Sequence, residues 1–223
     1  SAGIIVGCVG MTSLDYKFSA GLINMAGGNL MLVLVVAAGA CIILGMGLPT
    51  VPAYILVALI VTPALVPLGI EPVVIHMFVF YFALAAMVTP PVAGNVFVAA
   101  PMVNRSIWSV GGHAVRLGMA TYIVPFMFVL KPALLLSGGG LLDTLYAMLI
   151  AIVATTALCF ALARHGIVSA SWAETILALL AAVVTFLPVN WGFPVGGSLI
   201  VTIAVYQATK FLRKRGTKIQ GSH

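Results

Sequence analysis

Two short segments rich in glycine, proline and threonine interrupt long apolar runs of this chain. Residues 45–50, Gly-Met-Gly-Leu-Pro-Thr, divide the apolar run 30–68, and residues 89–91, Thr-Pro-Pro, divide the run 73–103. If these runs are membrane helices, each break exposes backbone groups that lipid cannot hydrogen-bond. Such breaks are tolerated only where protein covers them or where they line a cavity. The breaks are therefore the first places to look for function.

The composition excludes an ordinary soluble domain. The chain is 63% hydrophobic and 6% charged, whereas about 25% of the residues of a soluble domain are charged. Its net charge of +6 comes from ten Lys and Arg against four acidic residues. The basic residues lie in short loops and at the C-terminus, so orientation in a lipid bilayer explains them, and no nucleic-acid partner is predicted.

No pattern typical of an enzyme is present. The chain has no HExxH, no Gly-x-Ser-x-Gly, no paired intramembrane aspartates and no phosphate-binding loop. Cys8, Cys41 and Cys159 lie in apolar segments without CxxC spacing, which predicts small core residues. We therefore predict neither an enzyme, nor a cofactor, nor a transition-metal site.

The lengths of the apolar segments predict an all-α polytopic membrane protein, since a full crossing needs about 20 residues. Residues 15–28 are predicted to form an amphipathic or interfacial segment. The run 30–68 is predicted to be a helix broken at 45–50, and the short arms 73–88 and 92–103 a re-entrant hairpin. Conventional spans are predicted at 117–136, 145–163, 172–187 and 193–212.

Basic and neutral loops alternate along the second half of the chain. The segments 104–116, 164–165 and 213–215 are basic, whereas 138–140 and 189–191 are neutral. Basic loops concentrate on the cytoplasmic side of membrane proteins. This alternation predicts a multi-pass protein whose C-terminus is cytoplasmic.

The residue types in the breaks suit the binding of ions. Gly45, Gly47 and Pro49 allow several residues to leave helical geometry. Freed carbonyls could coordinate a cation such as Na⁺, and freed N–H groups at a helix start favour an anion. The hydroxyls of Thr50 and Thr89 could complete a cation shell or cap the following helix. The plain alternative is that both segments are only kinks.

These arguments predict a cation site next to a substrate site, with Na⁺ as the only metal. The predicted cation-site residues, acting through backbone and hydroxyl groups, are Gly45, Gly47, Leu48, Thr50, Thr89, Pro90 and Val92. The predicted substrate-site residues are Pro49, Pro91, Ala93 and Asn95. For Asn95, a ligand contact and a helix-packing hydrogen bond are equal alternatives.

Three charged or titratable residues have competing interpretations. His76 lies within an apolar arm and is either a protonatable coupling residue or a buried histidine bonded to a helix neighbour. Lys131, before Pro132, either binds substrate or, as we predict, extends its amine to the membrane interface. Glu71 lies in a turn beside Pro72 and is predicted to be solvated.

Several motifs in combination resemble a known family. They are Gly27-Gly-Asn-Leu, Gly45-Met-Gly-Leu-Pro-Thr-Val-Pro-Ala-Tyr54, His76-Met-Phe-Val-Phe-Tyr-Phe82, Thr89-Pro-Pro-Val-Ala93 and Val124-Pro-Phe-Met-Phe-Val-Leu-Lys-Pro-Ala-Leu134. They resemble the large membrane subunit of tripartite ATP-independent periplasmic (TRAP) transporters. The resemblance is greatest to the branch in which small and large subunits are fused and serve a TAXI-type receptor. It covers about residues 2–136, and residues 137–212 resemble the extra helices of such fusions more weakly.

The resemblance implies an elevator-type secondary transporter of small organic anions in the bacterial inner membrane. Transport in this family is usually driven by a Na⁺ gradient, with H⁺ as the alternative here. The implied partners are a periplasmic solute receptor and a small membrane subunit. Where other branches carry an acidic residue after the first break, this chain has Leu48-Pro49-Thr50.

We expect two domains. Residues 1–136 would be the second of two inverted repeats, and residues 137–223 a transmembrane extension with a basic cytoplasmic tail. Because the chain begins directly on an apolar stretch, we expect it to lie inside a longer polypeptide whose missing N-terminal half completes the site. The alternative function is a non-transporting membrane anchor or assembly subunit, which the regular spans of residues 137–223 suit.

Overall fold

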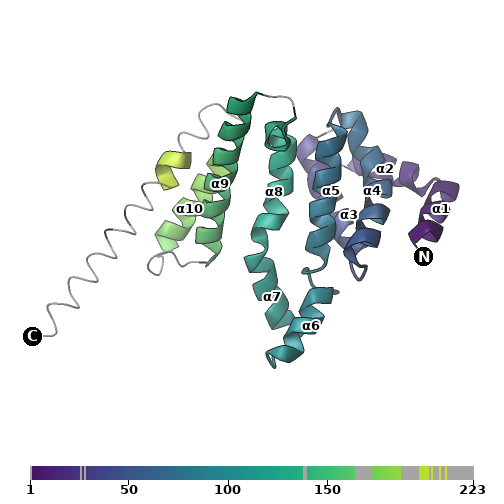
Figure 1. Cartoon of the computed structure of the whole chain (residues 1–223), viewed down its shortest axis with the longest axis horizontal. Coiled ribbons are helices and arrows are strands. Elements are labelled where there is room, and N and C mark those ends of the chain that lie inside the picture. The colour runs from purple at the N-terminus through teal and green to yellow at the C-terminus, as the bar shows by residue number, and fades with distance from the viewer. Residues whose placement is uncertain are drawn as a thin grey trace, which may run out of the picture. The chain divides into compact units, whose positions relative to one another are not determined.

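The computed structural model describes residues 2–25, 27, 29–137, 140–163, 172–186, 196–200, 202, 206 and 209 (Figure 1). Every regular element of this described part is a helix. Three helical stretches are long and apolar enough to cross a membrane, namely Thr50–Leu68, Ile107–Leu130 and Leu141–Ala161. The prediction of an all-α polytopic membrane protein is confirmed. The chain divides into two compact units, Ser1–Gly138 and Gly139–His223.

Unit 1 begins with two short helices. These are α1 (Ala2–Thr12) and α2 (Leu14–Met25), and they are joined at Ser13, which has a φ of 49°. Both helices pack on α4, and Leu22 of α2 is buried. The segment 15–28, predicted to be amphipathic or interfacial, is thus helical as far as residue 25.

The first break separates α3 (Leu30–Gly45) from α4 (Thr50–Leu65). Asn29 caps α3, because its side-chain oxygen accepts hydrogen bonds from two N–H groups of the first turn. At the other end, the chain leaves α3 through Gly47, whose φ of 77° lies in the left-handed region that glycine adopts without strain. A 3₁₀ turn, η1 (Val66–Leu68), follows α4.

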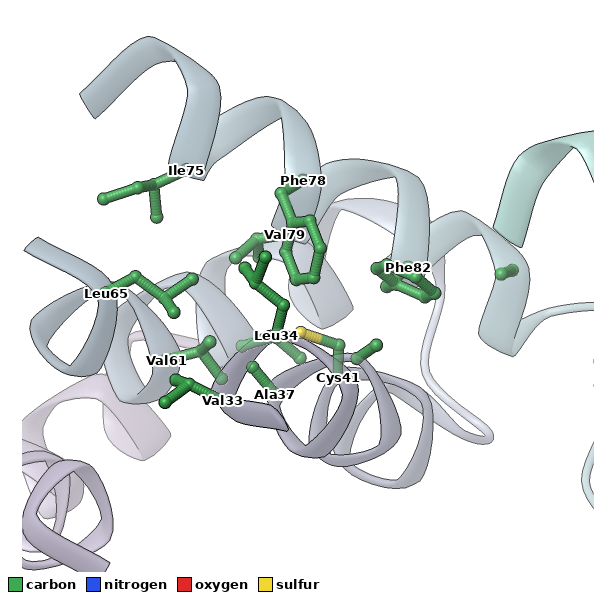
Figure 2. Close-up of a cluster of buried hydrophobic side chains, with 13 residues drawn as sticks. Val33, Leu34, Ala37, Cys41, Val61, Leu65, Ile75, Phe78, Val79 and Phe82 are labelled. Carbon is green, nitrogen blue, oxygen red and sulfur yellow. The ribbon is translucent and has the colours of Figure 1, made fainter. Parts of the chain in front are cut away.

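The chain reverses at this first break. A Cβ atom built on Gly45 would lie 3.8 Å from the Cβ atom of Ala53, which a straight continuation into α4 would not permit. Val33 near the start of α3 belongs to the same buried cluster as Leu65 at the end of α4 (Figure 2). The prediction of one broken helix is therefore wrong here. The arms form an antiparallel hairpin because both pack on α5.

The second break separates α5 (Pro72–Ala86) from α6 (Gly94–Met102). Within residues 72–117, all of which the structure describes, α6 packs on α7 (Ile107–Leu117) and does not run back along α5 (Figure 1). The predicted re-entrant hairpin of the arms 73–88 and 92–103 is therefore wrong. The physical reason is that the nine-residue helix α6 packs on α7, the next helix in the sequence, and not on α5.

Residues 104–116, predicted to be a basic loop, are largely helical. Ser106 caps α7 by accepting a hydrogen bond from the N–H of Ser109. After Gly118 the chain continues as α8 (Met119–Leu130), which is followed by the 3₁₀ turn η2 (Pro132–Leu135). The apolar helical stretch therefore begins at Ile107 with α7, whereas the predicted span 117–136 left α7 out.

The core of unit 1 lies around α5, which packs on α3, α4 and α8. The rings of Phe78 and Phe82 on α5 have centroids 4.9 Å apart. Both rings meet Phe126 of α8 edge to face, at 5.5 and 5.6 Å, an arrangement that aromatic pairs favour. Figure 2 shows the two α5 rings beside side chains of α3. This packing fixes α5, and with it the break at its end.

Unit 2 contains α9 (Leu141–Ala163) and α10 (Trp172–Phe186), which pack on each other. Most of their buried side chains are alanines, namely Ala147, Ala154, Ala157, Ala161, Ala178, Ala181 and Ala182. Small residues let membrane helices approach closely. Of the predicted helix 193–212, residues 196–200 are helical; most of the rest and the basic segments 164–165 and 213–215 lie outside the described residues.

Candidate functional site

The two breaks lie against each other. A Cβ atom built on Gly45 would lie 3.1 Å from the Cβ atom of Ala86, the last residue of α5. A Cβ atom built on Gly47 would lie 3.4 Å from Cγ1 of Val92 in the second break. The tip of the α3–α4 hairpin therefore touches the junction between α5 and α6. Predicted site residues that are distant in sequence are adjacent here, and we call this region the break junction (residues 45–50 and 86–95).

Backbone carbonyl groups of the break junction are left unpaired. In the first break, the carbonyl oxygen of Gly45 accepts a hydrogen bond from the backbone nitrogen of Leu48, 3.3 Å away. In the second break, the carbonyl oxygen of Met87 accepts one from the backbone nitrogen of Asn95, 3.2 Å away. In the described part of the chain, no hydrogen bond reaches the carbonyl groups of Gly47, Leu48, Pro90, Pro91 and Val92. These oxygens are available to a ligand.

Two helices begin at the break junction. The N-cap of α4 is Pro49 and that of α6 is Ala93, and neither supplies a side-chain hydrogen bond. The prediction that Thr50 or Thr89 caps the following helix is therefore wrong. Thr50 is already the first residue of α4, and Thr89 ends the turn that follows α5. The start of α4 presents N–H groups and the positive end of its helix dipole, whereas at the start of α6 the N–H groups of Asn95 and Val96 already donate to the carbonyl groups of Met87 and Ala93.

The Thr89 hydroxyl group has two partners. Its Oγ1 lies 2.6 Å from the carbonyl oxygen of Ala85 and 2.7 Å from the hydroxyl oxygen of Tyr122. Tyr122 belongs to α8 and is half-buried. Tyr122 could not be predicted from the sequence, because a hydroxyl pair between distant helices leaves no local pattern.

Helix α7 covers one side of the second break. A Cβ atom built on Gly111 would lie 2.7 Å from Cγ of Pro90, so no larger residue fits there without a shift. Gly111 is buried, and the Pro90–Pro91 peptide bond is cis. Gly111 was also missed from the sequence, since it is one of many glycines in an apolar chain.

The predicted substrate-site residues differ in exposure. Pro49, Pro91 and Asn95 are exposed, whereas Ala93 is fully buried. Pro91 also lines a groove of about 760 Å³ between α6 and the start of α7. The other residues of this groove are Phe97, Ala100, Pro101, Asn104, Arg105, Ser106, Ile107 and Trp108. An extended ligand at the break junction thus has room beside Pro91, whereas Ala93 contributes to packing.

The other polar residues lie away from the break junction. His76 forms the predicted hydrogen bond to a neighbouring helix, since its Nδ1 lies 3.0 Å from the hydroxyl group of Tyr54 on α4, but it is exposed and the predicted burial is wrong. Glu71 is exposed, as predicted, and its carboxylate accepts a hydrogen bond from the Ser137 hydroxyl group. Lys131 is half-buried where α8 ends.

The three cysteines differ from the prediction in part. Cys41 is buried in the α3–α5 cluster, whereas Cys8 and Cys159 are exposed, so the prediction of small core residues holds for Cys41 alone. Among the described residues, no group of three or more His, Cys, Asp or Glu side chains is placed to hold a metal ion. The segments 45–50 and 86–95 themselves carry neutral oxygen atoms and no charged side chain.

Comparison with known protein families identifies unit 1. The model of the DctM component of tripartite ATP-independent periplasmic transporters matches residues 1–139. The chain belongs to the DctM family. No curated protein and no solved structure gives a significant match. The DctM match ends at the boundary between the two units, so unit 2 lies outside it.

Membership of the DctM family establishes a role in transport. The family provides the large permease component of TRAP transporters, which is a multi-pass membrane protein working with a small membrane subunit and a periplasmic receptor. It is a family of transporters and not of enzymes. In this DctM chain, the break junction and the core that holds it lie entirely within the matched residues.

Proposed function

We propose that this chain takes part in secondary transport of a small organic anion, driven by an ion gradient, and that the break junction is the binding site. The observation that supports the proposal is the close approach of Gly47 to the Val92 side chain, because the segments on both sides of this contact contain unpaired carbonyl groups. Carbonyl oxygens can replace the water around a cation. The uncapped start of α4 favours a carboxylate nearby. Adjacent binding of cation and anion would couple their movements.

The coupling ion that we propose is Na⁺. Residues 45–50 and 86–95 contain no titratable side chain. The shell available to a cation therefore consists of neutral backbone and hydroxyl oxygens. Such oxygens suit an alkali cation and provide no acceptor for a transported proton.

The partners complete this proposal. The substrate would arrive from a soluble periplasmic receptor, and a small membrane subunit, fused as in the TAXI-type branch, would support the permease. Unit 1 would be the second inverted repeat of an elevator-type transporter in the bacterial inner membrane. An N-terminal repeat would cover the exposed side of Val92 and Asn95. The alternating basic segments favour a cytoplasmic C-terminus.

Accessibility of the second break to a thiol reagent tests the site. The complete transporter, with Cys8, Cys41 and Cys159 replaced, would receive a single cysteine at Val92, which is 44% exposed. We expect a water-soluble maleimide to label Val92→Cys without ligands, and Na⁺ with substrate to protect it. His113→Cys, at an exposed position of α7 outside the groove beside Pro91, is the control that should be labelled in both conditions. Labelling of Val92→Cys that ignores both ligands would contradict the site.

Uptake under separately imposed gradients tests the driving ion. Proteoliposomes containing the complete permease, with its receptor outside, would be given either a Na⁺ gradient or a pH gradient. We expect the Na⁺ gradient alone to drive accumulation of the carboxylate. Accumulation that follows the pH gradient in the absence of Na⁺ would overturn Na⁺ coupling, and the absence of accumulation under either gradient would favour an anchor subunit.

A further inference from the structure

We propose that Tyr122 is a positioning residue of the cation site, and that it acts by fixing the orientation of the Thr89 hydroxyl group. This inference rests on the proposed function, because it assigns a role to a side chain outside the break junction. The supporting contact is the 2.7 Å distance between the hydroxyl oxygens of Tyr122 and Thr89.

The direction of each hydrogen bond follows from the supply of protons. Thr89 has one hydroxyl proton and two lone pairs. The Ala85 carbonyl oxygen, 2.6 Å away, can only accept, so Thr89 must donate to it. Tyr122 must then donate its own proton to Thr89. One lone pair of Thr89 remains, and its direction is set by the other two bonds.

The packing of α8 on α5 holds Tyr122 beside Thr89. Phe126 lies one helical turn further along α8 and packs edge to face on Phe78 and Phe82 of α5. The same helical stretch also contacts the second break through Gly111, which lies against Pro90. The stretch Ile107–Leu130 therefore contacts two consecutive residues of the second break, Thr89 and Pro90, and packs against the break junction.

Removal of the Tyr122 hydroxyl group has a defined consequence. Thr89 would keep its bond to Ala85, but its free lone pairs would no longer have a single orientation. An oxygen that is not oriented in advance binds a cation less tightly, because ordering it then costs free energy on binding. The rate at saturating cation, which depends on movement of the filled site, would change little.

The test is the Na⁺ dependence of uptake by the complete transporter with its receptor in proteoliposomes. For Tyr122→Phe we expect the half-saturating Na⁺ concentration to rise about fivefold, the effect typical of losing one hydrogen bond, with the maximal rate within about twofold. Tyr81→Phe is the matched control. Tyr81 is half-buried on α5 and packs on Phe128 of α8, and its hydroxyl group makes no hydrogen bond in the described part of the chain.

Variants of Thr89 show whether Tyr122 acts through it. Thr89→Val should raise the half-saturating Na⁺ concentration by itself, and adding Tyr122→Phe should raise it no further. Thr89→Ser keeps the hydroxyl group and should retain the wild-type value, so it keeps the test informative if Thr89→Val fails to fold. Unchanged Na⁺ dependence in Tyr122→Phe, or full additivity with Thr89→Val, would overturn the inference. Wild-type uptake that does not depend on Na⁺ would instead overturn the proposed function.

Discussion

The two units pack apolar helices in different ways. In unit 1, the central helix α5 carries large aromatic side chains, and two breaks interrupt the helices around it. In unit 2, the α9 helix runs for 23 residues and meets α10 through alanines. Continuous helices satisfy their own backbone groups. Within the described residues, unit 1 is therefore the part whose backbone has oxygens to offer a ligand.

A single type of hydrogen bond makes the difference clearer. Thr89 in unit 1 and Thr155 in unit 2 each donate to the carbonyl group four residues earlier, both at 2.6 Å. The local bond is the same, but Thr89 also accepts from Tyr122 and lies beside unpaired carbonyl groups. The surroundings, rather than the residue type, make Thr89 a candidate ligand.

The largest effect is expected where the two breaks touch. Gly45→Leu would insert a side chain where even a Cβ atom lies 3.1 Å from Ala86. Overpacking of this kind costs roughly 1–3 kcal/mol, and because about 1.4 kcal/mol in a barrier is tenfold in rate, we expect gradient-driven uptake per mole of purified transporter to fall at least about tenfold. Gly39→Leu, in the same helix but with no neighbour within 4 Å, is the control and should stay within about twofold. Equal uptake by the two variants would show that the contact is unimportant.

An intermediate effect is expected from the matched threonines. Thr89→Val should raise the half-saturating Na⁺ concentration about fivefold, because it removes one hydroxyl oxygen from the proposed shell. Thr155→Val removes the same local hydrogen bond from α9 and should leave the Na⁺ dependence unchanged. Uptake measured against Na⁺ concentration compares them. A parallel shift in both variants would mean that the back-bonded hydroxyl acts through helix stability alone.

Packing in unit 2 is expected to affect stability more than transport. Ala181 on α10 is fully buried, so Ala181→Leu should overpack the interior of unit 2 and lower the thermal midpoint of the purified protein. The half-saturating Na⁺ concentration should remain within about twofold. Ala173→Leu, at an exposed position of α10, is the control for stability. A large change in Na⁺ dependence in Ala181→Leu would show that unit 2 contributes to the site.

The smallest effect is expected at His76. It lies ten residues before the end of α5, about 15 Å from the break along the helix axis, and its partner is Tyr54. We expect His76→Gln to change uptake by less than about twofold and to leave its dependence on external pH as in the wild type, in keeping with a structural hydrogen bond. Loss of the pH dependence in this variant would assign His76 to coupling.

The ends of the helices were more predictable than their directions. Helix α3 stops at Gly45 and α4 starts at Thr50 because glycine and proline act on the residues next to them. The reversal between these helices depends instead on contacts of Gly45 with Ala53 and Ala86. A contact between distant segments leaves no local signal, so the hairpin was assigned to the wrong break.

Helix α7 was missed for a different reason. Its basic residues favoured a loop, although Ile107, Val110, Ala114 and Leu117 recur at the spacing of one helix face. Giving the apolar periodicity of these residues more weight than the basic charge would have predicted helix α7. The residues of the break junction were identified from their types, and the structure brings both segments together. Tyr122 could not be identified in this way, because only the fold places it beside Thr89.

The antiparallel arrangement of α3 and α4 also bears on how the protein is inserted into the membrane. A hairpin returns the chain to the face from which it started, so Asn29 and Gly69 belong on the same side of the bilayer. An insertion error that straightened the hairpin would change the number of crossings by one and invert the sidedness of every later segment. If the basic segment 104–116 is cytoplasmic, as its charge predicts, Arg105 and Arg116 would then be translocated. The few residues of the tip thus influence the orientation of the chain that follows them.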